Sequence, residues 1–286
     1  MPFEKTKDAI LKTFNVSIST SCIQKNAEAI GEDISKKELN YIPSDFTEDC
    51  DRVYISIDGT GVPTVEGQCR EAKTIVIEKI KDNKIKKWYG SKISKIDDFK
   101  NYIESVSLGL CINKCETIVI LGDGAGWIDG IKYDLFPRSV RIIDFFHAAE
   151  YIHKGCEIIY GKESVLVKEK SEYLVEMLRE GEVLEVINEL KKRSKHLKSK
   201  KEIEKVINYF SNHNEDMDYE NYEIKNGFKI GSGVVEGACK YVVGVRFKRN
   251  GMRWTVKDAN FILSLRSLIL NNRLEYYFKT RFGKIA

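Results

Sequence analysis

Three acidic residues stand in local settings that suit phosphoryl-transfer chemistry. Asp58 lies in YISIDGTG and Asp123 in TIVILGDGAGW, each where an apolar stretch typical of a strand runs into glycine. Glu236 lies in IGSGVVEGACK, where we expect a helix to begin. Divalent metals prefer hard oxygen ligands, and two ions about 3.5–4 Å apart can activate an attacking oxygen and stabilise a leaving one. The three carboxylates therefore predict a two-metal site.

The two aspartates are expected at the ends of neighbouring strands. In an open sheet, functional groups collect outside the carboxyl ends of the strands. The glycines that follow them, Gly59 and Gly124, leave room for a metal or a phosphate. Asp-Gly is also a common turn dipeptide, and each one taken alone is more often a turn than a ligand. Their combination with Glu236 in a glycine-rich helix start favours the metal site.

Asp144 and His147 form an Asp-x-x-His pair that follows an apolar segment. His147 could contact a scissile phosphate or orient a water molecule, with Asp144 holding the imidazole. Asp144 could also simply cap a helix that begins at Phe145, which is an ordinary role for aspartate. Both interpretations stay open at this point.

The C-terminal part of the chain is basic. Residues 225–286 carry 13 Lys and Arg against 3 Asp and Glu, whereas residues 1–224 carry 34 against 40. Such a segment favours a polyanionic partner, because phosphate contacts gain affinity through counterion release, although a solvated lysine-rich surface gives the same pattern. The motif FKRNGMRW combines cations with an aromatic ring, which suits a DNA backbone and an unpaired base. The expected DNA-binding residues are Arg246, Lys248, Arg249, Arg253 and Trp254.

Two short amphipathic helices are expected at the N-terminus, over residues 4–14 and 20–31. Ser19 and Thr20 are candidate N-caps, and Gly31 is a candidate C-terminal stop. A helix, a tight turn and a second helix form the outline of a helix-turn-helix, and of any other helical hairpin.

The rest of the chain alternates strands and helices. Strand patterns are followed by helical ones, with turns at DGTG and KDNK. The expected strands are 53–58, 72–80, 84–90, 117–121 and 139–144. The expected helices are 95–109, a helix after GDGAG, a helical stretch from 147 to about 214, and helices over 234–245 and 256–270. This order predicts an α/β fold with a mixed sheet flanked by helices.

Bulk composition indicates a soluble globular protein. The chain has 286 residues, of which 42% are hydrophobic and 31% charged. No apolar run approaches the roughly 18 residues of a membrane span, and the N-terminus lacks a signal-peptide core, so we expect a cytoplasmic protein without membrane contact. The seven cysteines are scattered and odd in number, which favours reduced thiols over disulfides.

Several motifs carry a resemblance to a known family. The stretches DGTGVP, LGDGAGWI with LFP and IIDFFHAAEYI after it, and IGSGVVEGACKYVVGVRFKRNGMRW are similar to bacterial insertion-sequence transposases of the ISKra type. The likeness covers roughly residues 50–160 and 225–275. It implies an RNase H-like sheet interrupted by a helical insertion, and it assigns Asp58, Asp123 and Glu236 as a DDE triad that binds Mg²⁺ or Mn²⁺.

The resemblance also implies an organisation and an activity. We expect an N-terminal helical segment over 1–50, a catalytic domain over 51–146 and 226–286, and a helical insertion over 147–225. The expected activity is DNA cleavage and strand transfer at element ends, by a homodimer or higher oligomer that binds element ends and target DNA. Two alternatives stay open: a DNA-binding remnant without catalysis, and a metal-dependent phosphohydrolase acting on nucleotides.

Overall fold

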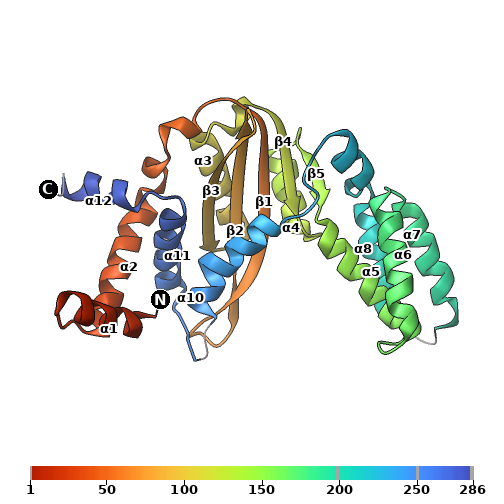
Figure 1. Cartoon of the computed structure of the whole chain (residues 1–286), viewed down its shortest axis with the longest axis horizontal. Coiled ribbons are helices and arrows are strands. Elements are labelled where there is room, and N and C mark those ends of the chain that lie inside the picture. The colour runs from red at the N-terminus through yellow and green to blue at the C-terminus, as the bar shows by residue number, and fades with distance from the viewer. Residues whose placement is uncertain (1, 198–199, 249–250, 284–286) are drawn as a thin grey trace. The chain divides into compact units, whose positions relative to one another are not determined.

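The structure, a computed structural model, describes residues 2–197, 200–248 and 251–283. Its centre is a five-stranded sheet with the strand order β3-β2-β1-β4-β5 (Figure 1). β1, β2 and β3 pair antiparallel, whereas β4 and β5 pair parallel. The strands are β1 (Cys50–Pro63), β2 (Cys69–Lys81), β3 (Lys84–Ile93), β4 (Cys115–Gly122) and β5 (Val140–Ile143). The predicted fold class, an RNase H-like mixed sheet flanked by helices, is therefore confirmed.

The chain forms two compact units, one made of Met1–Ile118 and Gly233–Ala286 and the other of Val119–Ser232. The longer helices of the first unit are α1 (Phe3–Phe14), α2 (Thr20–Lys36), α3 (Ile96–Gly109), α9 (Gly233–Ala238), α11 (Val256–Leu270) and α12 (Leu274–Phe282). Those of the second unit are α4 (Gly126–Leu135), α5 (Phe145–Tyr160), α6 (Val165–Arg179), α7 (Val183–Arg193) and α8 (Lys201–His213). The division into domains predicted from the sequence stays a prediction.

The segment DGTG is not a turn. β1 continues through it to Pro63 and stays paired with β2, so that Asp58 lies opposite Thr74 and Gly61 opposite Glu71. The prediction of a strand end at Asp58 is therefore wrong. Gly59 lies under the Glu71 side chain, whose carboxylate would be 2.4 Å from a Cβ at this position and would have to move for any larger residue. The expected turn at KDNK is confirmed: Asp82 and Asn83 both have positive φ, as a tight two-residue hairpin requires.

Gly31 does not end the second helix, which continues to Lys36. A Cβ at Gly31 would lie 2.1 Å from the carbonyl oxygen of Phe261, so the glycine allows α2 to approach the backbone of α11. Sequence reasoning placed glycine at a helix end, where it is common, but tertiary contact gives it a different role here. The N-cap prediction is confirmed, since the Ser19 hydroxyl accepts a hydrogen bond from the Cys22 N–H at 3.1 Å.

Helix α11 also covers the hydrogen-bonding edge of β3. The Asn260 side chain accepts from the Ile93 N–H at 2.8 Å and donates to the Ile93 carbonyl at 2.9 Å. Asn271 makes the same pair of bonds with Tyr89, at 2.8 and 3.0 Å. Two asparagines spaced along one helix thus satisfy backbone groups that an edge strand would otherwise expose.

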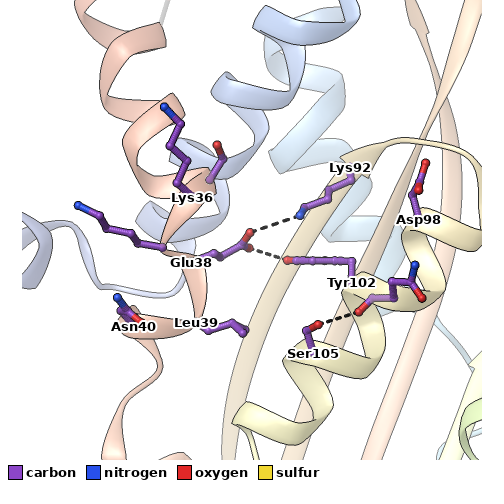
Figure 2. A pocket seen from close by; sticks show the side chains of 11 residues that line it. Lys36, Glu38, Leu39, Asn40, Lys92, Asp98, Tyr102 and Ser105 are labelled. Carbon is purple, nitrogen blue, oxygen red and sulfur yellow. Dashed lines mark hydrogen bonds and ion pairs between the residues drawn. The ribbon is translucent and has the colours of Figure 1, made fainter.

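A short 3₁₀ helix, η1 (Glu38–Tyr41), joins α2 to the rest of the first unit. The Tyr102 hydroxyl of α3 donates to Glu38 at 2.5 Å, and both side chains are buried (Figure 2). This contact fixes the end of the N-terminal helical pair against α3. Recognition of DNA by that pair stays a prediction.

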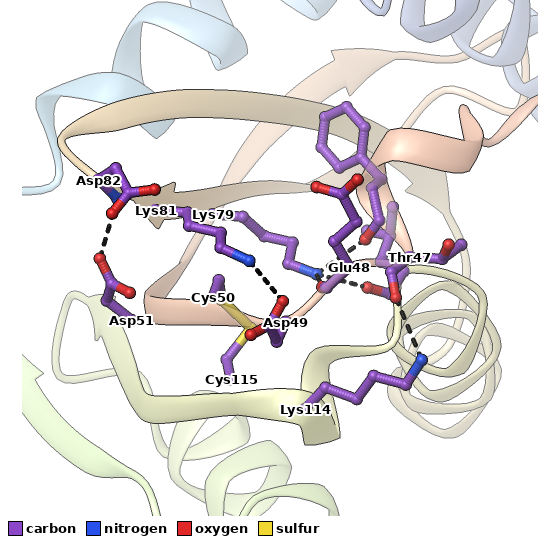
Figure 3. The surroundings of a disulfide bond; sticks show 12 residues. Thr47, Glu48, Asp49, Cys50, Asp51, Lys79, Lys81, Asp82, Lys114 and Cys115 are labelled. Carbon is purple, nitrogen blue, oxygen red and sulfur yellow. Dashed lines mark hydrogen bonds and ion pairs between the residues drawn. A yellow bond between two sulfur atoms is a disulfide. The ribbon is translucent and has the colours of Figure 1, made fainter.

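Two of the cysteines form a disulfide. Cys50, the first residue of β1, is bonded to Cys115, the first residue of β4 (Figure 3). The prediction of reduced thiols is therefore wrong for this pair. Sequence spacing could not reveal the bond, because 65 positions separate two residues that the sheet brings together.

A buried lysine lies beside the disulfide. The Lys79 ammonium of β2 donates to the carbonyls of Phe46, Glu48 and Leu110 at 2.7, 2.6 and 3.0 Å (Figure 3). Burial lowers its pKa below the ordinary value, but these three acceptors compensate for the loss of water. The lysine thereby ties the segment before β1 to the end of α3.

The helical stretch of the second unit begins at Phe145, two residues before the expected start. α5 packs against α6 and α8. Its Tyr151 ring stacks on Tyr209 of α8, with ring centroids 3.9 Å apart. The helices bury aliphatic side chains at helical spacing, as in Val186, Ile187 and Leu190 of α7.

Candidate active site

Asp58 lies in the interior of β1 and is partly buried. Its carboxylate accepts a hydrogen bond from the Gly59 N–H at 2.7 Å. It also contacts the buried thiol of Cys239, a residue far along the chain. Burial, followed by the negative charge of Asp58, raises the pKa of that thiol to about 12. Cys239 is therefore a neutral neighbour of the carboxylate at physiological pH.

Glu236 occupies the first turn of α9, as predicted, and it is exposed. α9 packs against β1 and β2, and it continues directly into a π-helical segment, η7 (Cys239–Gly244). Glu236 lies about one helical turn before Cys239, but it is exposed, whereas Cys239 belongs to the buried face of the helix. The first unit thus brings Asp58 and the helix of Glu236 to the same part of β1.

The basic motif adjoins the same strand. The Lys248 ammonium donates to the Thr60 hydroxyl, two residues after Asp58. At the end of the motif, Trp254 forms an isolated bridge with Thr64, and its N–H donates to the carbonyl of Pro63, the last residue of β1, at 3.3 Å. The segment that contains the motif is therefore attached to β1 at both ends.

The members of the motif differ in exposure. Lys248 and Arg253 are exposed, whereas Trp254 and Arg246 are buried. The Arg246 guanidinium lies 3.7 Å from the ring centre of Phe3 and 5.0 Å from that of Trp254. Arg249 lies outside the described residues. Lys248 and Arg253 are thus the described side chains of the motif that face solvent, and Arg246 and Trp254 pack in the core in this structure.

Asp123 follows β4 in the second unit and is partly buried. Its carboxylate accepts from the Ala125 N–H at 3.0 Å, which is the local turn that Asp-Gly commonly makes. Gly124 is closely covered, because a Cβ there would lie 2.7 Å from Tyr209 and 2.8 Å from His213. The turn interpretation of Asp-Gly is therefore correct at Asp123, and this turn holds the carboxylate at the end of β4. Metal binding by Asp123 stays a prediction.

Asp144 is the N-cap of α5 and also the partner of His147. One carboxylate oxygen accepts from the His147 N–H at 2.9 Å and lies 3.5 Å from His147 Nδ1. The other oxygen accepts from the backbone N–H and the hydroxyl of Ser232. The two interpretations of Asp144 are therefore compatible, because one side chain caps the helix and orients the imidazole.

These contacts lower the pKa of Asp144 and raise that of His147. Burial of Asp144 opposes its ionisation, but hydrogen bonds from His147 and Ser232 lower its pKa to about 2. The bond to Asp144 raises the pKa of His147 to about 9, against the effect of burial and with help from the charges of Glu150 and Asp123. The pair is thus an aspartate and an imidazolium at neutral pH.

Sequence reasoning missed several residues of these regions. Cys239 and Ser232 flank Glu236 in the glycine-rich motif, but no local pattern indicates that a thiol contacts Asp58 or that a hydroxyl contacts Asp144. Arg141 is buried and donates to the Asp123 carbonyl. An arginine within an otherwise apolar strand was the one available signal for that contact.

The donor chemistry of the acidic trio fits Mg²⁺ or Mn²⁺, which take carboxylate oxygens. Asp58 and Glu236 belong to the first unit and Asp123 to the second. Over residues 2–197, 200–248 and 251–283, no group of three or more His, Cys, Asp or Glu side chains is arranged to hold a metal ion. Metal binding by the trio therefore stays a prediction.

The fold and the site regions define an α/β protein with an RNase H-like sheet. The chain belongs to the uncharacterised protein family UPF0236, whose model matches residues 3–274. No curated protein matches the sequence. Among the described residues, no helix combines the length and apolar character needed to cross a membrane.

Proposed function

We propose that the protein is a DNA transposase that catalyses metal-dependent cleavage and strand transfer at element ends. The observation that carries the proposal is the convergence on β1. This strand holds Asp58, contacts the helix of Glu236 through Cys239, and binds the basic segment through Thr60. An aspartate on this strand, with a cationic segment attached to the same strand, suits a site that positions a phosphodiester.

Each residue has a role in this proposal. Asp58, Asp123 and Glu236 would hold Mg²⁺ or Mn²⁺, which neutralises charge that develops on the phosphate oxygens. Lys248 and Arg253 bind the DNA backbone from the exposed face of the basic segment. The proposal places the DNA phosphates next to the part of β1 that contains Asp58 and Thr60.

The charge of His147 supports one of the two roles considered for it. A general base must be neutral, but His147 is held as a cation by Asp144 up to a pH of about 9. Since Asp144 faces Nδ1, the second N–H of the imidazolium is left to donate to an anion. We therefore assign His147 to binding a phosphate oxygen rather than to activating water.

The proposal is tested with a supercoiled plasmid that carries the DNA flanking the reading frame. We expect Asp58→Asn, Asp123→Asn and Glu236→Gln each to lower Mg²⁺-dependent nicking by about two orders of magnitude or more, while DNA binding persists. Asp97→Asn and Glu275→Gln, at exposed carboxylates on α3 and α12, are matched controls that should keep full activity. Full nicking by any of the three site variants would contradict the assignment.

The same preparations separate the alternatives. Joining of pre-cleaved ends excludes a DNA-binding remnant, whereas salt-sensitive binding without joining supports one. Lys248→Gln with Arg253→Gln should weaken DNA binding and flatten its salt dependence by about one unit of slope per lost phosphate contact. Unchanged DNA affinity in that variant would favour a phosphohydrolase acting on nucleotides.

A further inference from the structure

A second polar site lies in the first unit, where η1 faces α3 and β3. It is a pocket of about 390 Å³ lined by residues of the α2 end, of η1, of β3 and of α3 (Figure 2). Three lysines line it, Lys36, Lys37 and Lys92, together with the carboxylates of Glu38 and Asp98. A pocket of this size accommodates a ligand as large as a nucleotide.

Glu38 gives the pocket an unusual buried acceptor. Its side chain is 9% exposed, and its oxygen Oε1 accepts from the Tyr102 hydroxyl. Its other oxygen, Oε2, has no hydrogen-bond partner within the described residues, and forms a long ion pair with the Lys92 ammonium at 4.0 Å (Figure 2). Burial raises the pKa of Glu38 above the ordinary value. A buried carboxylate oxygen without a donor is costly, so the site is suited to a ligand that supplies one.

Backbone packing maintains this arrangement. A Cβ at Gly90 of β3 would lie 2.2 Å from the Tyr102 hydroxyl, so only glycine lets that hydroxyl reach Glu38. Tyr102 is itself buried, and the negative charge of Glu38 adds to burial in raising the pKa of Tyr102 well above its ordinary value. The tyrosine therefore remains a donor to Glu38, and Oε2 is the carboxylate oxygen that lacks a hydrogen bond within the described residues.

Lys92 is positioned to exchange partners. Its ammonium lies 4.0 Å from Glu38 Oε2, beyond hydrogen-bond distance, and 4.0 Å from the centre of the Tyr102 ring. A ligand donor can replace it at Oε2 while the ammonium turns to an anionic group. Lys36 and Lys37 form exposed ion pairs with Glu32 and Asp33, which cost little to rearrange.

We propose that this pocket binds one unpaired nucleotide, with an amino group of its base donating to Glu38 Oε2 and its phosphate bound by Lys36, Lys37 and Lys92. A simple cation fits poorly, because three lysines line the pocket and the Lys92 ammonium lies 4.0 Å from Glu38 Oε2. A simple anion fits poorly as well, because Glu38 would repel it. A ligand with a donor at one end and a phosphate at the other matches both features.

The same chemistry predicts which bases bind. Cytosine, adenine and guanine carry exocyclic amino groups, and a glutamate is a known acceptor for the amino group of cytosine. Thymine presents one N–H between two carbonyls, whose oxygens would face the carboxylate. The pocket should therefore discriminate against thymine. This inference does not depend on the acidic trio, because no metal takes part in it.

The test measures the binding of labelled single-stranded homo-oligonucleotides by fluorescence anisotropy in the presence of EDTA. We expect oligo(dC) and oligo(dA) to bind the full chain about tenfold more tightly than oligo(dT), as one hydrogen bond to a charged group allows. Glu38→Gln should abolish this preference. Glu78→Gln, at a second buried glutamate that pairs with Lys87 on the sheet, is the matched control and should keep it.

A second variant guards against a folding defect in Glu38→Gln. Asn101 is an exposed residue of α3 that lines the pocket, so Asn101→Trp should fill the pocket and leave the Glu38–Tyr102 bond intact. It should remove the base preference as well. Equal binding of all oligonucleotides by the wild-type chain would overturn the proposal. A base preference that survives in both variants would also overturn it. The same holds if inorganic phosphate displaces every homo-oligonucleotide equally well.

Discussion

Asp58 and Asp144 both belong to sheet regions of the protein, but their surroundings are built in different ways. Asp144 caps the helix that follows it and holds an imidazolium three residues later, and its second carboxylate oxygen binds Ser232 of the same unit. Asp58 lies inside a long strand, and its thiol neighbour comes from a helix far along the chain. Asp144 is thus part of the architecture of α5, whereas Asp58 contacts a thiol of the helical segment that follows Glu236.

The two aspartates also differ in how their charges are balanced. A carboxylate that caps a helix and binds an imidazolium has its charge balanced within the protein. A carboxylate whose neighbour is a neutral thiol is a better place to gather cations from solution. We therefore expect Asp58 to matter for activity and Asp144 to matter first for stability.

The largest expected effect is the loss of stability on replacing Asp144, which should exceed the loss on replacing Asp58. Asp144→Ala removes a helix cap and leaves the buried donors of Ser232 and His147 without an acceptor, which should cost about 3 kcal/mol in the free energy of unfolding. Asp58→Asn keeps the shape of its side chain and should cost less than about 1 kcal/mol. Urea denaturation of both variants measures the difference, and equal losses would remove the distinction.

The disulfide should raise the free energy of unfolding by about 2–4 kcal/mol, since it closes a long loop between β1 and β4. Cys50→Ser should lower the midpoint of urea denaturation, and a reducing agent should lower that of the wild-type chain to a similar value. Cys22→Ser, at an exposed free cysteine, is the control and should change neither. A wild-type midpoint that ignores the reducing agent would show that the bond is absent in solution.

A smaller effect concerns the charge of His147. Its imidazole should titrate near pH 9 by NMR, and Asp144→Asn should return the pKa toward 6.5. Because the pKa of His147 is raised on folding, its ion pair contributes its full stability below pH 6.5. This stability is lost as the pH rises through about 9. Because the pKa of Asp144 is lowered on folding, its contacts contribute their full stability above pH 3.8. This stability is lost as the pH falls through about 2. An unshifted His147 in the wild-type chain would contradict the pairing.

Features fixed by local chemistry were predictable from the sequence. The cap at Ser19, the turn at Asp82-Asn83 and the helix over residues 256–270 all follow from short patterns, and all are confirmed. Asp144 belongs to this class, because a cap and an i,i+3 partner both lie within one helical turn. The α/β class followed from the order of strand and helix patterns.

Features that depend on tertiary contact were not predictable. Gly59 and Gly31 carry the composition of a turn and of a helix stop, but one lies within a paired strand and the other beneath a crossing helix. The bond between Cys50 and Cys115 depends on strand order rather than on spacing. For the candidate site, the residue types of the trio were readable, whereas the contact between Cys239 and Asp58 required the fold.

The central claim is that oxygens of Asp58, Asp123 and Glu236 hold a common set of divalent cations. Fe²⁺ can replace Mg²⁺ at such a site, where it reduces added hydrogen peroxide to hydroxyl radicals that cut the backbone nearby, while ascorbate returns Fe³⁺ to Fe²⁺. The account predicts cuts close to residues 58, 123 and 236, all suppressed by excess Mg²⁺ and all lost in Asp58→Asn. Cuts near only one of these positions, or cuts that Mg²⁺ does not suppress, would contradict it.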